Sequence, residues 1–365
     1  QAGDQLFLQL LADAGSAKTR LCEALLVSKK CHSLEHLTGF HSGVKDGSGD
    51  DFSLLTRINK KTLITPEGDV LIASPRFIEL MSQQRRIFDG TSGASYKNHK
   101  EDLKWTGLRT PWIIAGTFVL LNMDQSRLGD RFLRFIIDPP DEVRPILIRV
   151  GYTALRSVKK RSNCSQDSIV DESMLLAYRL TGGYVDWLRD NVEDLIENTE
   201  VDEERMINEC ATLAEFVALM RSRPEPDARK LEAHDSCEVP TRLTHQFVRL
   251  TCCLAASIER PVDEEVMRRV RKVAMDSSKG RTLSIVQSLP LPNEEGLSAD
   301  ALAIQTGRSR ATELNYLKFL GRTGAVEHYQ KMKGEVKLGV RWRLTPKMKS
   351  LLDFMGKREH TLEAT

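Results

Sequence analysis

The chain of 365 residues is long enough to form two or three domains, because a single hydrophobic core stops growing below this length. Its 41% hydrophobic content is typical of a folded protein and excludes a wholly disordered one. The net charge of +2 neither indicates nor excludes a nucleic-acid partner, so that question depends on local patches of charge.

Seven cysteines are scattered without a C-x-x-C pair or a histidine at zinc spacing, which suggests neither a metal site nor a disulfide framework. No run approaches the roughly 18 apolar residues of a membrane span, and no signal peptide opens the chain. We therefore expect a cytoplasmic protein with no membrane partner. Because the first residue is Gln1, we also expect further sequence upstream.

The first motif follows an apolar run from Leu6 to Leu11, which predicts a strand. Small residues then lead to Lys18 and Thr19 at the start of a helical segment. A phosphate-binding loop requires this context, since backbone amides and a helix N-terminus attract phosphate oxygens, while a lysine and a hydroxyl reach the outer phosphates and Mg²⁺. The residues expected to bind ATP are Asp13, Ala14, Gly15, Ser16, Ala17, Lys18 and Thr19.

Both glycines of the usual G-x-x-x-x-G-K-[ST] pattern are replaced, by Ala12 and Ala17. Each methyl group restricts the positive-φ conformations that glycine adopts freely. The alternative interpretation is an ordinary turn between a strand and a helix, with Lys18 solvated.

Further strands alternate with helices along the next part of the chain. Residues 28–51 are predicted to be irregular, 62–65 a strand, 75–87 a helix, 112–117 a strand and 135–137 another strand. This alternation predicts an α/β domain with a parallel sheet covered by helices on both faces.

Polar residues end two of these strands, where the chemistry of a nucleotide site is expected. Glu67 follows the 62–65 strand and is a candidate base and Mg²⁺-associated carboxylate, although Pro66 beside it cannot bind a metal. Thr117 ends the 112–117 strand, where its side chain could meet a γ-phosphate or the attacking water.

The polar segment from Asp89 to Lys104 has two interpretations. It is either a plain surface hairpin or a loop that projects into the pore of a ring. In the second case Lys97 and Lys100 would contact phosphates of a threaded DNA strand, without regard to base sequence.

Helical periodicity extends from Pro145 to Ala274, and the acidic stretch from Asp186 to Glu209 is most simply a solvated face. From Arg281 onward we expect three helices followed by two strands about Gly334. The helices cover 283–289, a segment that begins at an N-cap at Ser298, and 309–322. That order predicts a winged-helix module, a variant of the helix-turn-helix.

Basic residues exceed acidic ones in this C-terminal part, with 14 Lys or Arg against 9 Asp or Glu, a difference of +5. A positive patch suits a DNA phosphate track, although winged helices also mediate protein contacts. The candidate DNA-binding residues here are Arg308, Arg310, Lys318, Lys331 and Lys333.

Taken together, these motifs resemble the AAA+ ATPases, and among them most closely the minichromosome maintenance (MCM) helicase branch. The phosphate loop of that branch has alanine before the lysine, as at Ala17. The segments Phe40 to Gly43, Leu128 to Phe132 and Pro240 to Glu265 are also similar to motifs of that branch. The family has an Asp-Glu pair where this chain has Pro66-Glu67.

The resemblance implies a P-loop AAA+ core over 1–140, a helical lid over 141–278 and the winged-helix domain over 281–365. It implies that Arg131 acts on the nucleotide of a neighbouring subunit, that Arg242 is a second sensor, and that Thr117 takes the first-sensor position, where the family usually has Asn.

The implied function is that of an ATP- and Mg²⁺-dependent DNA helicase or translocase acting in replication, as a homo-oligomer with a hexameric ring favoured. A bacterial or phage-encoded protein is favoured, with a phage or mobile element as a candidate source. An alternative is a DNA-bound switch, such as an initiator or defence-system regulator, that binds ATP but hydrolyses it weakly because of Pro66. A third is a transcription factor whose ATPase domain binds no nucleotide.

Overall fold

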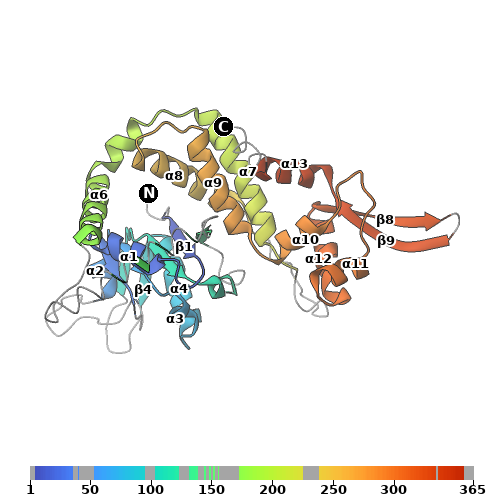
Figure 1. Ribbon diagram of the computed structural model, residues 1–365, viewed down its shortest axis with the longest axis horizontal. Coiled ribbons are helices and arrows are strands. Elements are labelled where there is room, and N and C mark those ends of the chain that lie inside the picture. The colour runs from blue at the N-terminus through green and yellow to red at the C-terminus, as the bar shows by residue number, and fades with distance from the viewer. Residues whose placement is uncertain are drawn as a thin grey trace. The chain divides into compact units, whose positions relative to one another are not determined.

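A computed structural model describes residues 5–35, 40, 53–94, 103–122, 131–138, 172–224, 238–333 and 336–356, with residues 144, 148, 151, 152 and 155. The chain divides into two compact units, one of residues 1–123 and 134–194 and one of 124–133 and 195–365. Figure 1 labels several elements of each. The domain boundaries near 140 and 278 stay predictions.

The first unit is built on a five-stranded sheet in the order β2-β3-β6-β1-β7. The pairs β2 with β3, β3 with β6, and β6 with β1 are parallel, which confirms the α/β class. The strands are β1 (Phe7–Leu11), β2 (Cys31–Ser33), β3 (Thr62–Thr65), β6 (Trp112–Gly116) and β7 (Phe132–Ile136). The neighbouring helices are α1 (Lys18–Leu26), α2 (Leu54–Ile58), α3 (Asp69–Ile72), α4 (Phe77–Phe88) and the 3₁₀ helix η1 (Phe118–Asn122).

Aromatic side chains fill the core around β1 and β6. Phe7 lies edge-on to Phe88 and to Trp112, with ring centroids 4.9 and 6.2 Å apart, and Phe40 lies edge-on to Trp112 at 5.8 Å. Such edge-to-face pairs add to the free energy gained by burying the rings. The apolar runs that predicted β1, β3 and β6 therefore form buried strands, as expected.

Two elements differ from the sequence prediction. The short strand β2 lies in the 28–51 stretch predicted to be irregular; it has no apolar run, and it forms because β3 offers a parallel edge. The strand predicted over 135–137 begins earlier, at Phe132, because Phe132 and Leu133 are buried as well.

The segment predicted as either a hairpin or a pore loop contains the antiparallel pair β4 (Thr91–Ala94) and β5 (Leu103–Thr106). Lys97 and Lys100 lie outside the described residues, so their role in DNA binding stays a prediction.

The long helix α6 (Glu172–Glu197) is attached to the first unit mainly by polar contacts. The Tyr178 hydroxyl donates to Glu23 at 2.8 Å, and the Ser28 hydroxyl donates to Asp186 at 2.6 Å. Close approach is possible at Gly182, where a Cβ would lie 2.8 Å from Val27.

The second unit contains three long helices, α7 (Glu203–Arg221), α8 (Thr241–Ser257) and α9 (Glu264–Ser278). Their buried faces carry Phe216, Phe247 and Val270. Asp202 and Asp263 cap α7 and α9 by accepting backbone N–H bonds, which satisfies amides that have no partner within the helix.

The rest of this unit comprises α10 (Arg281–Ser288), α11 (Ala299–Thr306), α12 (Arg310–Arg322), the antiparallel strands β8 (Val326–Lys333) and β9 (Val336–Leu344), and α13 (Pro346–Gly356). The predicted N-cap is confirmed, because Ser298 accepts from the Ala301 amide at 3.1 Å. Leu297 also forms a β-bridge with Trp342. Helix α13 was not predicted from the sequence.

Candidate functional site

The loop after β1 folds around the side chain of Lys18, which is buried although it carries a charge. Its Nζ donates to the carbonyl oxygens of Ala12 and Asp13 at 2.8 and 2.7 Å and to Ser16 Oγ at 3.1 Å. A buried ammonium requires such partners, because desolvation without them is costly. This arrangement contradicts the alternative of a solvated lysine on an ordinary turn.

The backbone of the loop adopts two positive φ angles. Gly15 has φ 83°, and Ala17, just before α1, has φ 62° and ψ 17°. A left-handed conformation costs a residue other than glycine roughly 1–2 kcal/mol. The loop thus keeps a glycine-like conformation at Ala17 despite the methyl group, which is the kind of strain found at functional sites. Asp13, Ala14 and Thr19 are exposed around it.

Hydrogen bonds join the segment after β3 to the end of β6. The Gly68 amide donates to the Ala115 carbonyl at 2.7 Å, and both carboxylate oxygens of Asp69 lie 3.1 Å from the Thr117 amide that donates to them. A Cβ on Gly116 would lie 2.9 Å from Asp69 Oδ1, so glycine is needed for this approach. From the sequence, Asp69 could compensate for the acid missing at Pro66 if the turn allowed it; the structure instead engages its carboxylate with the Thr117 amide.

The strand order brings three loops to one edge of the sheet. Because β6 lies between β1 and β3, the Thr117 end of β6 lies between the Lys18 loop and Glu67. Neighbouring strands are about 4.8 Å apart, so the ends of β1 and β3 are about 10 Å apart. Glu67 is exposed at this edge, and Pro66 and Thr117 are half-buried. Ligands of open α/β sheets bind outside the carboxyl ends of the strands.

The second unit contains both arginines with a predicted role at the nucleotide: Arg131, expected to act on a neighbouring subunit, and Arg242, expected to be a sensor. Arg131 is half-buried, and its carbonyl accepts from Gln246 Nε2 at 2.7 Å. Arg242 is half-buried in the first turn of α8.

Arg134, in β7, is a buried charged residue. It is only 4% exposed, because its Nε donates to the buried Gln9 side chain of β1 at 3.2 Å.

The predicted DNA-binding residues of the second unit fall into two groups. Arg308 and Lys318 are exposed, before and on α12. Arg310 forms an ion pair with Asp300 at 3.0 Å, and Lys331 forms one with Glu295. Exposed pairs contribute little stability, so a phosphate could replace the carboxylate at small cost. The backbone of Lys333 lies in β8.

A buried ion pair that the sequence analysis missed holds α12 in place. Glu313 is fully buried and accepts from Arg281 Nη2 at 2.8 Å and from Thr306 Oγ1 at 3.0 Å. The Arg281 guanidinium also lies over the Tyr316 ring, 4.4 Å from its centroid. These contacts join α10, α11 and α12.

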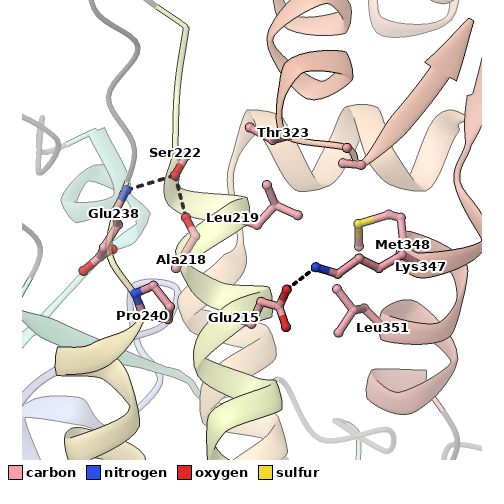
Figure 2. A pocket seen from close by; sticks show the side chains of 12 residues that line it. Glu215, Ala218, Leu219, Ser222, Glu238, Pro240, Thr323, Lys347, Met348 and Leu351 are labelled. Atoms are coloured by element: carbon pink, nitrogen blue, oxygen red, sulfur yellow. Dashed lines mark hydrogen bonds and ion pairs between the residues drawn. The ribbon is translucent and has the colours of Figure 1, made fainter.

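A cleft of about 280 Å³ lies elsewhere in the second unit, between α7 and the C-terminal elements (Figure 2). The exposed ion pair between Lys347 and Glu215, 2.5 Å, crosses it. Ser222 Oγ accepts from the Glu238 amide at 3.1 Å and donates to the Ala218 carbonyl at 2.7 Å. No predicted site residue lines this cleft, so it is separate from the candidate nucleotide site.

Within the described part of the chain, no group of three or more His, Cys, Asp or Glu side chains could hold a metal ion. Burial raises the pKa of Cys22 and of Cys210 to about 11, which disfavours the reactive thiolate. None of the described helices has the length and apolar character to cross a membrane.

Comparison with models of known protein families gives no match, and comparison with curated proteins gives none either.

Proposed function

We propose that this protein is an AAA+-type ATPase with a helical lid and a C-terminal winged helix, and that it acts on DNA as an MCM-like helicase or translocase. The observation that carries the proposal is the Lys18 ammonium, held by acceptors of a loop with glycine-like backbone at the carboxyl edge of a parallel sheet. Phosphate oxygens would supply the acceptors that the loop now provides to this lysine.

ATP and Mg²⁺ suit the residues present. The loop amides and the N-terminus of α1 face the same edge of the sheet, and Thr19 is exposed in the first turn of α1. Mg²⁺ commonly keeps several waters and is held by substrate phosphates with one or two protein ligands, so a cluster of three carboxylates is not required. Thr19 and Glu67 would be those ligands, and the ion would neutralise charge on the phosphates.

Glu67 would position the attacking water or accept its proton, without help from a neighbouring aspartate. Asp69 does not replace the acid missing at Pro66, because its carboxylate is engaged with the Thr117 amide. Hydrolysis supported by Glu67 alone would be slower than in an enzyme with both acids.

The second unit would supply the remaining parts. Arg242 would act as a sensor from the lid, and Arg131 would reach the nucleotide of a neighbouring subunit in a homo-oligomer, with a hexameric ring favoured. The exposed Arg308 and Lys318 make α12 the proposed DNA-binding helix.

The engagement of Asp69 also favours a second candidate. A DNA-bound protein that binds ATP and hydrolyses it weakly would use the same loop as a switch rather than as a motor.

The test is the steady-state ATPase rate with and without single- and double-stranded DNA, for the wild type and for Lys18→Ala, Glu67→Gln and Arg131→Ala. A motor predicts DNA-stimulated turnover that each change lowers by about 100-fold or more. Lys29→Ala is the control, since Lys29 is an exposed lysine after α1.

The outcomes separate the candidates. Tight ATP binding without turnover in the wild type would exclude the motor and support the switch. No ATP binding by the wild type would exclude both the motor and the switch.

A further inference from the structure

The hairpin β8–β9 exposes aliphatic side chains to an unusual degree. Met332 is 47% exposed, Val336 63%, Leu338 45% and Val340 42%. Val326 and Leu344, at the base of the same hairpin, are buried. Since isolated exposed apolar residues are common but clusters mark interaction sites, these four side chains, the hairpin aliphatic set, indicate a binding surface.

The pairing register separates Met332 and Val340 of this set from Lys331 and Arg341, whereas Val336, opposite Lys333, lies on the same face as Lys331. Lys331 is opposite Gly339 and Arg341 is opposite Tyr329, so Lys331 and Arg341 share one face. Val340 is opposite Gln330 on the other face, which Met332 shares, two residues along β8 from Gln330.

A bulge lies beyond these pairs, because Met332 is opposite Lys337 while Lys331 is opposite Gly339. Leu338 is therefore the extra residue of β9, and Gly339 beside it has φ 108°. Bulges re-aim side chains and raise the local twist.

Side-chain contacts hold the basic face near its base. The Gly296 amide donates to the Tyr329 hydroxyl at 3.0 Å, and the Arg343 guanidinium lies over the Tyr329 ring at 5.1 Å. Lys331 is held by Glu295, whose pKa is lowered by that ammonium. Lys337 is exposed and lies opposite Met332, beside the aliphatic side chains. Positive charge beside exposed aliphatic groups is complementary to a ligand with both phosphates and accessible bases.

We propose that the hairpin binds DNA at a junction between duplex and single strand. The aliphatic set contacts bases that have lost their stacking partner, and Lys331, Lys337 and Arg341 lie along the phosphates. Apolar side chains inserted at base steps are a known means of unstacking DNA, and bases that are already unpaired cost least to contact. The inference rests on DNA binding by the proposed winged helix, but it does not depend on ATP hydrolysis.

The test measures affinity of the full chain, without nucleotide, for a forked DNA and for a blunt duplex of the same sequence. The fork carries 2-aminopurine, whose fluorescence reports stacking, at the junction. Leu338→Ser with Val340→Ser should lower fork affinity by about five- to tenfold, leave duplex affinity unchanged and abolish the fluorescence change. Both side chains are exposed, so folding should be unaffected.

Ile304→Ser is the matched control, because Ile304 is an aliphatic residue 84% exposed on α11, outside the hairpin. It should change neither affinity. Equal loss on fork and duplex, no loss on either, or an effect of Ile304→Ser as large as that of the hairpin variant would each overturn the proposal.

Light scattering on the same samples checks for a second copy of the chain on this surface. A change of oligomeric state in the hairpin variant, with fork affinity unchanged, would overturn the DNA assignment. If the wild type bound duplex but showed no preference for the fork, only this inference would fail. If it bound no DNA at all, DNA binding by the winged helix would fail with it.

Discussion

The sheet edge of the first unit and the C-terminal elements of the second are shaped by opposite means. At the sheet edge, small residues and backbone hydrogen bonds fix the loops, as at Gly68, Gly116 and Ala17, while Glu67 stays exposed. Around α12, a buried ion pair between Arg281 and Glu313 fixes a helix. A site formed by backbone amides requires neighbouring backbone segments to approach closely. A site formed by helical side chains requires that the helix carrying them be fixed in position.

Among variants that test this comparison, Glu313→Ala should have the largest effect. It leaves the half-buried Arg281 guanidinium, whose side chain is 21% exposed, without its partner, and we expect a cost of about 3 kcal/mol, at the low end for buried pairs. We expect lower stability of the C-terminal elements in urea unfolding and weaker DNA binding, with ATP binding retained. Asp353→Ala is the control, because Asp353 is 53% exposed in its ion pair with Lys349. Equal losses in the two variants would contradict a fixing role for Glu313.

Gly68→Ala should have the next largest effect, on the other region. A Cβ there would lie 2.2 Å from Ile114 Cγ2, so β3 and β6 would have to separate. Overpacking of this kind costs about 1–3 kcal/mol, and we expect a lower melting temperature together with a lower kcat. Gly183→Ala serves as control, since a Cβ at Gly183 in α6 meets nothing within 4 Å. A Gly68→Ala protein with wild-type melting temperature and kcat would refute the close-approach argument.

Ala17→Gly should instead stabilise the protein. It removes a left-handed alanine from the loop around Lys18, and after the added flexibility of the unfolded chain we expect a gain of up to about 1 kcal/mol. Chemical denaturation measures this. Ala14→Gly, at a loop position without positive φ, should instead be neutral or slightly destabilising. Destabilisation by both changes would argue against strain at Ala17.

The smallest expected effect is on the stability of the second unit at acid pH. Hydrogen bonds and charge from Arg268 and Arg269 lower the pKa of Glu265 from 4.5 to about 2. Because the folded-state pKa is the lower one, the stabilisation is complete above about 4.5 and is lost as the pH falls toward 2. Glu265→Gln should flatten the dependence of melting temperature on pH within this window. Glu204→Gln, at the exposed start of α7, should leave the slope as in the wild type.

Local sequence determined the elements whose cause is local. Apolar runs predicted β1, β3 and β6, because buried parallel strands need apolar side chains on both faces. Ser298 predicted the start of α11, since an N-cap acts within one turn. The small residues before Lys18 likewise predicted a loop between a strand and a helix, which lies between β1 and α1.

Only the tertiary structure decided how these parts meet. The order that puts β6 between β1 and β3 depends on contacts far apart in sequence. The burial of Arg134 and Glu313 could not be predicted, because each charge is compensated by a residue distant along the chain, Gln9 and Arg281. Asp69 shows the same limit. Its carboxylate could have remained available to a metal, and it is instead engaged because β6 brings the Thr117 amide within 3.1 Å.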